Sequence, residues 1–307
     1  MKHFLTLADL APQEFRDILD LSVRLKTEWQ AGEGEPLLKN KVLGMIFQKP
    51  SLRTRVSFDV AMLHLGGNAL YLSPNEIQLG KRESVADVAR VISRYVDIVM
   101  ARVFGHYDLV ELAKYASIPV INALSDYSHP CQGAADFLTI LEKKDGFEGK
   151  KLAYLGDGNN VSTSLLFGAT KLGMDFAIGS PKGYEIHPAV WDMGRQFAAE
   201  SGAQILATTN PLKAVEGADV VYTDAWASMG QEEEAAKRRR IFPPYRIDEE
   251  ILEYAKSDAI VMHCLPAHRG EEITNAVADG PQSALFDQAE NRLHSEKAIL
   301  AWVLDLA

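Results

Sequence analysis

The sequence has little cysteine and no long apolar run, and each of these absences excludes a class of protein. The two cysteines, Cys131 and Cys264, lie far apart, so they form no disulfide framework and fit a reducing cytoplasm. No stretch approaches the ~20 apolar residues that span a bilayer. The N-terminal residues form neither a secretory signal nor an Arg-rich transit peptide. We therefore expect a cytoplasmic protein.

Positive charge is also in deficit. Lys and Arg number 32 and Asp and Glu number 42, which gives a formal net charge of −10 at pH 7. This balance argues against a broad surface for nucleic acid or anionic membrane, so an anionic ligand needs a local group of arginines. The charged run at residues 232–240 carries both signs, and we interpret it as a solvated segment rather than a nucleic-acid patch.

The length and the pattern of apolar runs indicate the fold class. A chain of 307 residues suits two domains. Short apolar runs that alternate with helical stretches predict an α/β fold, with parallel sheets covered by helices on both faces. The expected strands are 42–47, 69–72, 98–101 and 120–124, then 152–155, 176–178, 204–207, 220–223 and 260–262. The expected helices include 12–29, 55–65, 85–92, 109–115, one from about 131 that bridges the two sheets, and 294–304, which could pack back on the first domain.

Polar residues that fit no core pattern follow several of these strands, where ligands bind in open α/β sheets. The first group is Ser51-Leu52-Arg53-Thr54-Arg55, which opens a helix. Free N–H groups at a helix start, two hydroxyls and two guanidinium forks all suit a phosphate. The alternative is a Ser N-cap followed by exposed arginines, since the glycines and lysine of a P-loop are missing.

Two further groups follow the strands 98–101 and 120–124. Arg102 adds a cation at the same edge, unless its long stem simply carries the charge to solvent. His129 and Gln132 begin a helix and could donate hydrogen bonds to a carbonyl oxygen, stabilising the charge that develops when an acyl-type carbon is attacked. A loop with a capping role is the alternative for this segment.

The second half of the chain offers a glycine loop and a carboxylate with a thiol. Gly156-Asp157-Gly158-Asn159-Asn160 resembles a dinucleotide fingerprint, but Val161 replaces its third glycine and no acid ends the next strand. Nucleotide binding is therefore disfavoured, and Asn160 remains placed for a polar contact to another ligand. Asp224 and Cys264 follow neighbouring strands and could hold or deprotonate an amine.

The same segments contain residues that could bind a metal. His129, Cys131, His263, Cys264 and His268 are all potential ligands. They come as His-x-Cys and as an adjacent His-Cys, whereas zinc sites favour wider spacings. We expect no metal.

Together, in order and over nearly the whole chain, these motifs resemble the aspartate/ornithine carbamoyltransferase family. Ser51-x-Arg53-Thr54-Arg55, Arg102 and His129-Pro130-Cys131-Gln132 match the family's carbamoyl phosphate side. The pieces that are similar to the ornithine branch are residues 156–160, Asp224 with Ser228-Met229-Gly230, and His263-Cys264-Leu265-Pro266.

The resemblance implies a fold, ligands and an assembly. It implies two doubly wound parallel-sheet domains, with residues 1–137 and the C-terminal helix (about 288–307) binding carbamoyl phosphate and residues 138–287 binding L-ornithine. It also implies a homotrimer or a multiple of trimers with active sites near subunit interfaces, and no cofactor. Gln78 matches a position that reaches the neighbouring subunit's phosphate site.

The resemblance further implies roles for single residues. Leu52 stands where many members of the ornithine branch have Thr, and the change should matter little if this position contributes its backbone N–H. Asp224, Cys264, His129 and Arg102 are expected to take part in catalysis. The residues expected to contact carbamoyl phosphate are Ser51, Leu52, Arg53, Thr54, Gln78, Arg102, His129, Gln132, Cys264, Leu265 and Arg292. Those expected to contact ornithine are Asn160, Asp224, Ser228 and Met229.

Three alternatives stay open at this point. A sister transferase could act on putrescine or an N-acylated ornithine, although Asp224 with the Ser-Met-Gly segment suits a zwitterionic amino acid. A nicotinamide-dependent oxidoreductase is disfavoured by the missing third glycine. A catalytically inactive binding protein is disfavoured because every polar site residue is present.

Overall fold

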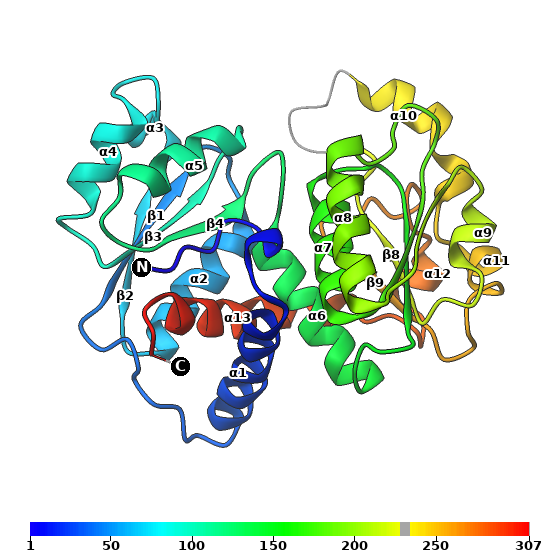
Figure 1. Ribbon diagram of the computed structural model, residues 1–307, viewed down its shortest axis with the longest axis horizontal. Coiled ribbons are helices and arrows are strands. Elements are labelled where there is room, and N and C mark those ends of the chain that lie inside the picture. The colour runs from blue at the N-terminus through cyan, green and yellow to red at the C-terminus, as the bar shows by residue number, and fades with distance from the viewer. Residues whose placement is uncertain (228–233, 307) are drawn as a thin grey trace. The chain divides into compact units, whose positions relative to one another are not determined.

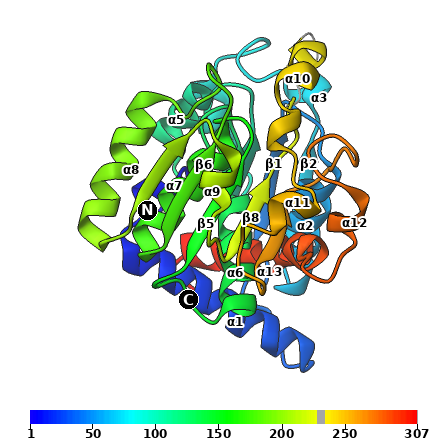
Figure 2. The same cartoon turned by 90° about the vertical axis from the view of Figure 1, so that its right-hand side faces the viewer.

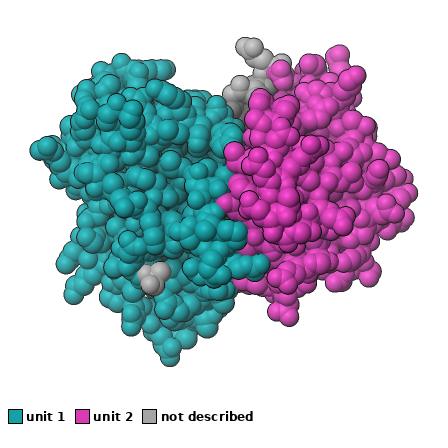
Figure 3. Space-filling model, in the orientation of Figure 1, with its two compact units in different colours: residues 1–138, 290–307 teal, residues 139–289 magenta. Residues whose placement is uncertain are grey.

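The computed structural model describes residues 1–227 and 234–306, and it divides into two compact units (Figure 3). Unit 1 comprises Met1–Leu138 and Glu290–Ala307, and unit 2 comprises Thr139–Ala289. Among the described residues, no helix has both the length and the apolar character needed to cross a membrane.

Unit 1 is built on a parallel sheet with the strand order β2-β1-β3-β4. Strands β1, β3 and β4 are buried along almost their whole length, as expected of a parallel sheet, whereas the edge strand β2 is partly exposed. The predicted strands are confirmed to within one residue: β1 (Val42–Phe47), β2 (Asn68–Leu72), β3 (Ile98–Arg102) and β4 (Val120–Leu124).

Helices cover both faces of this sheet (Figure 1). Because side chains alternate along a strand, Val99 and Ala101 of β3 pack with Leu109 and Leu112 on one face, which leaves Arg102 on the other face. The helices that contribute to this unit are α1 (Pro12–Gln30), α2 (Leu52–His64), α3 (Pro74–Ile77), α4 (Val85–Ile92), α5 (His106–Tyr115), the start of α6 (Pro130–Lys144) and most of α13 (Leu285–Val303).

Helices α2, α5 and α13 begin three, three and nine residues earlier than the apolar pattern predicts. Helix α2 begins at Leu52 because Ser51 caps it: the Ser51 hydroxyl accepts a hydrogen bond from the Thr54 N–H. Helix α13 begins at Leu285 rather than 294, because its first turns bury polar residues such as Gln288 and Asn291, which hide the apolar period.

The last helix packs on the first unit, as predicted. Lys297 of α13 donates to the Leu25 carbonyl of α1 at 2.9 Å, and Lys26 of α1 donates to Asn291 of α13 at 2.8 Å.

Unit 2 is built on a second parallel sheet, with the order β7-β6-β5-β8-β9. Figures 1 and 2 show α7 and α8 on one face of the sheet, with α9, α11 and α12 on the other. The strands are β5 (Lys151–Leu155), β6 (Asp175–Gly179), β7 (Ile205–Thr208), β8 (Val220–Thr223) and β9 (Ile260–His263). The helices are α7 (Asn160–Leu172), α8 (Pro188–Ser201), α9 (Pro211–Val215), α10 (Ala235–Ile241), α11 (Glu249–Leu252) and α12 (Asn275–Ala278).

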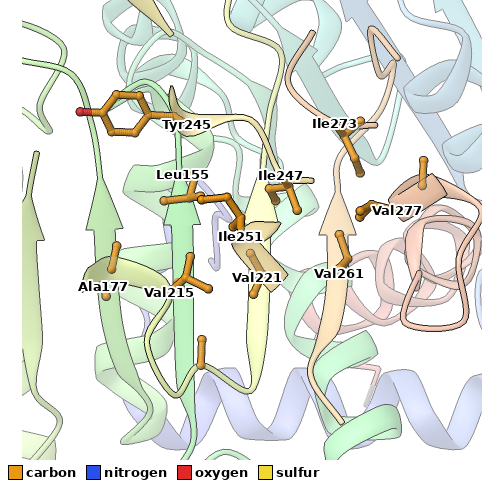
Figure 4. Packing of buried hydrophobic residues seen from close by; sticks show 14 of the residues in the cluster. Leu155, Ala177, Val215, Val221, Tyr245, Ile247, Ile251, Val261, Ile273 and Val277 are labelled. Atoms are coloured by element: carbon orange, nitrogen blue, oxygen red, sulfur yellow. The ribbon is translucent and has the colours of Figure 1, made fainter. Parts of the chain in front are cut away.

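The core of unit 2 follows the alternation of its strands (Figure 4). Leu155, Val221 and Val261 pack with Ile251 and Val277 from the helices on one face.

Each sheet contains a point at which the strand order reverses. In unit 1 the chain goes from β1 to β2 on one side and then to β3 and β4 on the other. In unit 2 it goes from β5 to β6 and β7, then returns to β8 and β9 beside β5. Ligands of doubly wound sheets bind outside the carboxyl ends of the strands at such points.

Candidate active site

The start of α2 lies at the reversal point of unit 1. Ser51 caps the helix, and its hydroxyl lies 3.3 Å from the Thr54 nitrogen and 3.1 Å from the Thr54 hydroxyl oxygen. Leu52 is the first helical residue and is 76% exposed. Its N–H belongs to the helix-start groups that have no intrahelical partner. The Ser51 cap therefore lies in the same segment as the N–H groups that are available for an anion.

Arg102 ends β3 beside the end of β1. It is paired in register with Phe47, and its carbonyl accepts from the Gln48 N–H at 2.8 Å. The side chain does not reach solvent, since Arg102 is only 6% exposed. A buried guanidinium at a strand end requires negative groups around it.

His129 lies among arginines at the start of α6. Burial first, then the charges of Arg292, Arg102 and Arg53, hold its pKa well below the usual 6.5. The ring is therefore neutral near pH 7 and can donate one N–H without carrying a charge. The charges of three arginines thus act on His129, in a chain whose net charge is negative.

A buried network joins α6 to α13. Arg292 donates to the Gln132 Oε1 at 2.9 Å, and the Gln132 Nε2 donates to Asp136 at 2.7 Å. Arg292 also donates to Glu296 at 2.6 Å. Burial raises the pKa of Glu296 to about 7, against the lowering effects of Arg292 and Ser57. The Gln132 amide thus turns its oxygen towards Arg292 and its nitrogen towards Asp136.

Asp224 and Cys264 lie at the reversal point of unit 2, after the neighbouring strands β8 and β9. The Cys264 thiol donates to Asp224 Oδ1 at 2.9 Å. The Ala225 N–H donates to the same oxygen at 2.7 Å, and Asn159 Nδ2 donates to Oδ2 at 2.7 Å. The predicted meeting of a carboxylate and a thiol at adjacent strand ends is confirmed.

The glycine loop before α7 packs closely against the backbone of residues 184–186. A Cβ on Gly158 would lie 2.3 Å from the Glu185 backbone, and the Gly158 N–H donates to the Tyr184 carbonyl at 2.8 Å. This glycine therefore allows close backbone packing, without any role for a pyrophosphate. Asn159 caps α7, and Asn160 is its first residue.

The expectation of a solvated charged run is wrong at Arg238. Lys237, Arg239 and Arg240 are exposed, but Arg238 is 4% exposed. It donates to Asp157 at 2.6 Å and to the Trp226 carbonyl at 2.7 Å. The acid that stabilises it lies 81 positions earlier, so the local pattern could not reveal the pair.

Gln78 and Leu265, two further predicted ligand residues, are described mainly by their backbone conformation. Gln78 is exposed and adopts a left-handed backbone, with φ 45°, at the end of α3. Leu265 has φ 56°, and its N–H donates to His263 Nδ1 at 2.8 Å. The predictions at Ser228 and Met229 lie outside the described residues.

One group of potential metal ligands includes the same strand ends. Asp224, His263 and Cys264 each place a ligand atom within 4.8 Å of the others. His263 uses both ring nitrogens within the protein, because Nδ1 accepts from Leu265 and Nε2 lies 3.0 Å from Glu272 Oε1. This donor set therefore does not fit a metal unless those hydrogen bonds break.

Two family models match the chain. The aspartate/ornithine carbamoyltransferase carbamoyl-P binding domain matches residues 2–142, and the Asp/Orn binding domain of the same family matches residues 148–303. The chain belongs to the aspartate/ornithine carbamoyltransferase family. The resemblance inferred from the motifs is thus confirmed.

Similar members of this family include proteins from archaea and bacteria. Ornithine carbamoyltransferase of Pyrococcus horikoshii is 54% identical over 303 residues, which cover 99% of this chain and 96% of the relative. The solved ornithine carbamoyltransferase of Pyrococcus furiosus superposes with a TM-score of 0.97 at 53% identity, covering 99% of this chain and 97% of that chain. The solved anabolic ornithine carbamoyltransferase of Campylobacter jejuni has a TM-score of 0.94 at 41% identity, and the match covers 100% of both chains.

The sequence analysis did not assign a role to four polar residues that contact the predicted motifs. They are Asn159, Asp136, Glu296 and Arg238. Two of them carried a local signal. Asp136 follows Gln132 by four positions, and Glu296 follows Arg292 by four, which is the spacing of neighbours on one helix face. Arg238 carried no such signal.

Proposed function

We propose that this protein transfers the carbamoyl group of carbamoyl phosphate to the side-chain amine of L-ornithine, giving L-citrulline and phosphate. The observation that carries the proposal is the group of arginines around neutral His129, in a chain whose net charge is −10. The ornithine carbamoyltransferases that are more than half identical to it support ornithine as the acceptor.

The phosphate is proposed to bind at the start of α2. The first N–H groups of the helix, including that of Leu52, and the helix dipole favour a dianion there. The guanidinium forks of Arg53 and Arg102 match phosphate oxygens in pairs. The hydroxyls of Ser51 and Thr54 complete the proposed set, with Arg55 behind it, where its guanidinium stacks on Tyr71 at 4.1 Å.

The carbamoyl group is proposed to be polarised by neutral donors. Negative charge develops on its oxygen as the amine attacks, and donors already aimed at that oxygen stabilise it. His129 suits this task because its lowered pKa keeps the ring neutral, so that it donates an N–H without adding a positive charge. Gln132, Arg292, Cys264 and the Leu265 carbonyl are proposed to contact the rest of the group.

The ornithine amine is proposed to meet Asp224 and Cys264. An amine with an ordinary pKa of ~10.4 must lose a proton before it can attack. The ammonium gives its first proton to solvent beside Asp224 and Cys264, and the neutral amine then forms the C–N bond of a tetrahedral intermediate. As the intermediate collapses, the C–O bond to phosphate breaks, and phosphate leaves with the electron pair and accepts the second proton of the amine. Direct attack needs no acyl-enzyme on Cys264. Asn160, Asp224, Ser228 and the Met229 backbone are proposed to meet the α-amino and α-carboxyl groups.

We infer that the protein works as a homotrimer or a multiple of trimers. Apolar side chains on α2 and on the edge strand β2 are unusually exposed, with Leu52 at 76%, Leu63 at 60% and Leu70 at 50%. Burial of such a face is a common reason for association. Gln78 is exposed at the end of α3 and is proposed to reach a neighbouring phosphate site.

The physiological setting is also a proposal. Relatives from Pyrococcus furiosus and Campylobacter jejuni are named anabolic, which supports a role in arginine biosynthesis. The low cysteine content supports a cytoplasmic location. No cofactor is required, because positioning and charge stabilisation can supply the rate.

The test is product formation from carbamoyl phosphate with ornithine, putrescine, N-acetylornithine and aspartate in parallel. Citrulline from ornithine, with little product from the others, is the expected result. Preference for putrescine or N-acetylornithine would be consistent with the proposed phosphate site but would contradict ornithine as the acceptor. Absence of any turnover would favour a binding protein instead.

A further inference from the structure

Asp224 is held by a neighbour that has no assigned role. We propose that Asn159 is a positioning residue for Asp224, whose carboxylate it holds in the orientation that receives the side-chain amine of the acceptor. This inference rests on the proposed function and deepens it on the amine side.

The cap of α7 fixes the Asn159 side chain. Its Oδ1 accepts from the N–H groups of Val161 and Ser162, each at 3.0 Å. These are free donors at the start of a 13-residue helix, and an Asn cap satisfies them. The helix therefore determines which end of the amide carries the oxygen.

With the oxygen committed to the helix, the nitrogen must face the other way. Asn159 Nδ2 lies 2.7 Å from Asp224 Oδ2, at the end of β8. A flipped amide would place its nitrogen against two N–H groups and its oxygen against a carboxylate oxygen. Both contacts would be repulsive, so the cap and the contact with Asp224 support each other.

The donors around Asp224 leave a defined direction for a ligand. Oδ1 accepts from the Ala225 N–H and from the Cys264 thiol, while Oδ2 accepts from Asn159. A carboxylate has about four lone-pair positions. The three donors therefore leave roughly one for a substrate N–H, on the oxygen that Asn159 holds.

The electrostatic surroundings make a neutral donor at position 159 important. Asp157 is close enough that the charge of Asp224 contributes to its raised pKa, after the larger effect of burial. Arg238 compensates Asp157 at 2.6 Å. A second acid beside Asp224 would add repulsion, whereas an amide donor relieves it.

The main test is Asn159→Ser. Serine is an effective N-cap, so the helix start keeps its acceptor, but the shorter side chain cannot reach Asp224. The melting temperature should stay near that of the parent. The kcat/KM for ornithine should fall about 10- to 100-fold, as for the loss of one hydrogen bond to a charged group. The KM for carbamoyl phosphate should stay unchanged.

The chain offers a matched control in Asn210. This residue caps α9 in the same way, with Oδ1 accepting from Leu212 and Lys213 at 3.0 and 3.3 Å. It is exposed and follows the edge strand β7, two strands from β5. Asn210→Ser should keep parental kinetics. Asn159→Asp keeps a cap and adds a negative charge, so its loss of kcat/KM should exceed that of Asn159→Ser.

A ligand without the reacting amine separates positioning from general damage. L-norvaline has the carbon chain and α-groups of ornithine but no side-chain amine. Because norvaline keeps only the contact of Asp224 with the α-amino group, its inhibition constant against ornithine should rise by a smaller factor in Asn159→Ser than the kcat/KM for ornithine falls. An equal loss for both ligands would overturn the inference.

The remaining outcomes separate this inference from the proposed function. If the parent forms citrulline and Asn159→Ser forms it equally well, the inference fails alone. If the parent does not use ornithine, the proposed function and the inference fall together. If Asn159→Ser unfolds at a clearly lower temperature than Asn210→Ser, Asn159 is structural and the inference is overturned.

Discussion

Replacing Glu296 with Gln removes a buried charge while keeping the shape of the side chain. Glu296 is 0% exposed, and Arg292 donates to its Oε1 at 2.6 and 3.1 Å. Burial raises its pKa from the ordinary 4.5 to about 7, although Arg292 and Ser57 both act to lower it. The cost of burying the charge therefore exceeds the gain from its partner.

The raised pKa predicts how stability depends on pH. Between about pH 4.5 and pH 7 the folded protein keeps a proton that the unfolded chain releases, so the free energy of unfolding falls as the pH rises through this window. At about 1.4 kcal/mol per pKa unit, the contribution of Glu296 is on the order of 3 kcal/mol. The Gln variant has no such contribution.

The assay is urea unfolding of the parent and of Glu296→Gln from about pH 5 to about pH 8, at one protein concentration. As the pH rises, the unfolding free energy of the parent should fall by about 3 kcal/mol relative to that of Glu296→Gln. Glu290→Gln is the control, since Glu290 lies on the same helix with its side chain 54% exposed. A difference between parent and Glu296→Gln that stays constant over this range would refute the reasoning.

Three further predictions concern single contacts. Arg102→Met should raise the KM for carbamoyl phosphate and lower kcat, and unchanged steady-state kinetics would remove Arg102 from the phosphate site. Arg238→Met leaves the carboxylate of Asp157 buried without its 2.6 Å partner, so denaturant unfolding should show a loss of about 3–5 kcal/mol; a loss below about 1 kcal/mol would contradict this. Gly158→Ala places a Cβ 2.3 Å from the Glu185 backbone and should lower the melting temperature, whereas Gly105→Ala, where nothing lies within 4 Å, should not.

The strands were predictable because burial on both faces makes them continuous apolar runs. Residues 42–47 and 220–223 form β1 and β8 with the predicted bounds. Helix starts were harder to locate. The cap at Ser51 and the buried polar turns of α13 carry no apolar period, so the predicted helices began three and nine residues late.

Some site residues were visible in the sequence because they follow strands. Strand ends of a parallel sheet meet at one edge, so Asp224 and Cys264 could be expected to lie together. Asn159 and Arg238 could not be assigned in this way. Their partners are 65 and 81 positions away, and no local pattern encodes such a separation.

The sequence by itself therefore determined the alternating elements, the family and the residue types available at each strand end. These depend on short-range periodicity and on motifs that are contiguous in the chain. Only the tertiary structure decided which groups share a hydrogen bond and which charges are buried. Arg238 and Glu296 illustrate the reason: the energy of a charge depends on its solvent exposure and its partners, and both are set by segments that meet only when the chain folds.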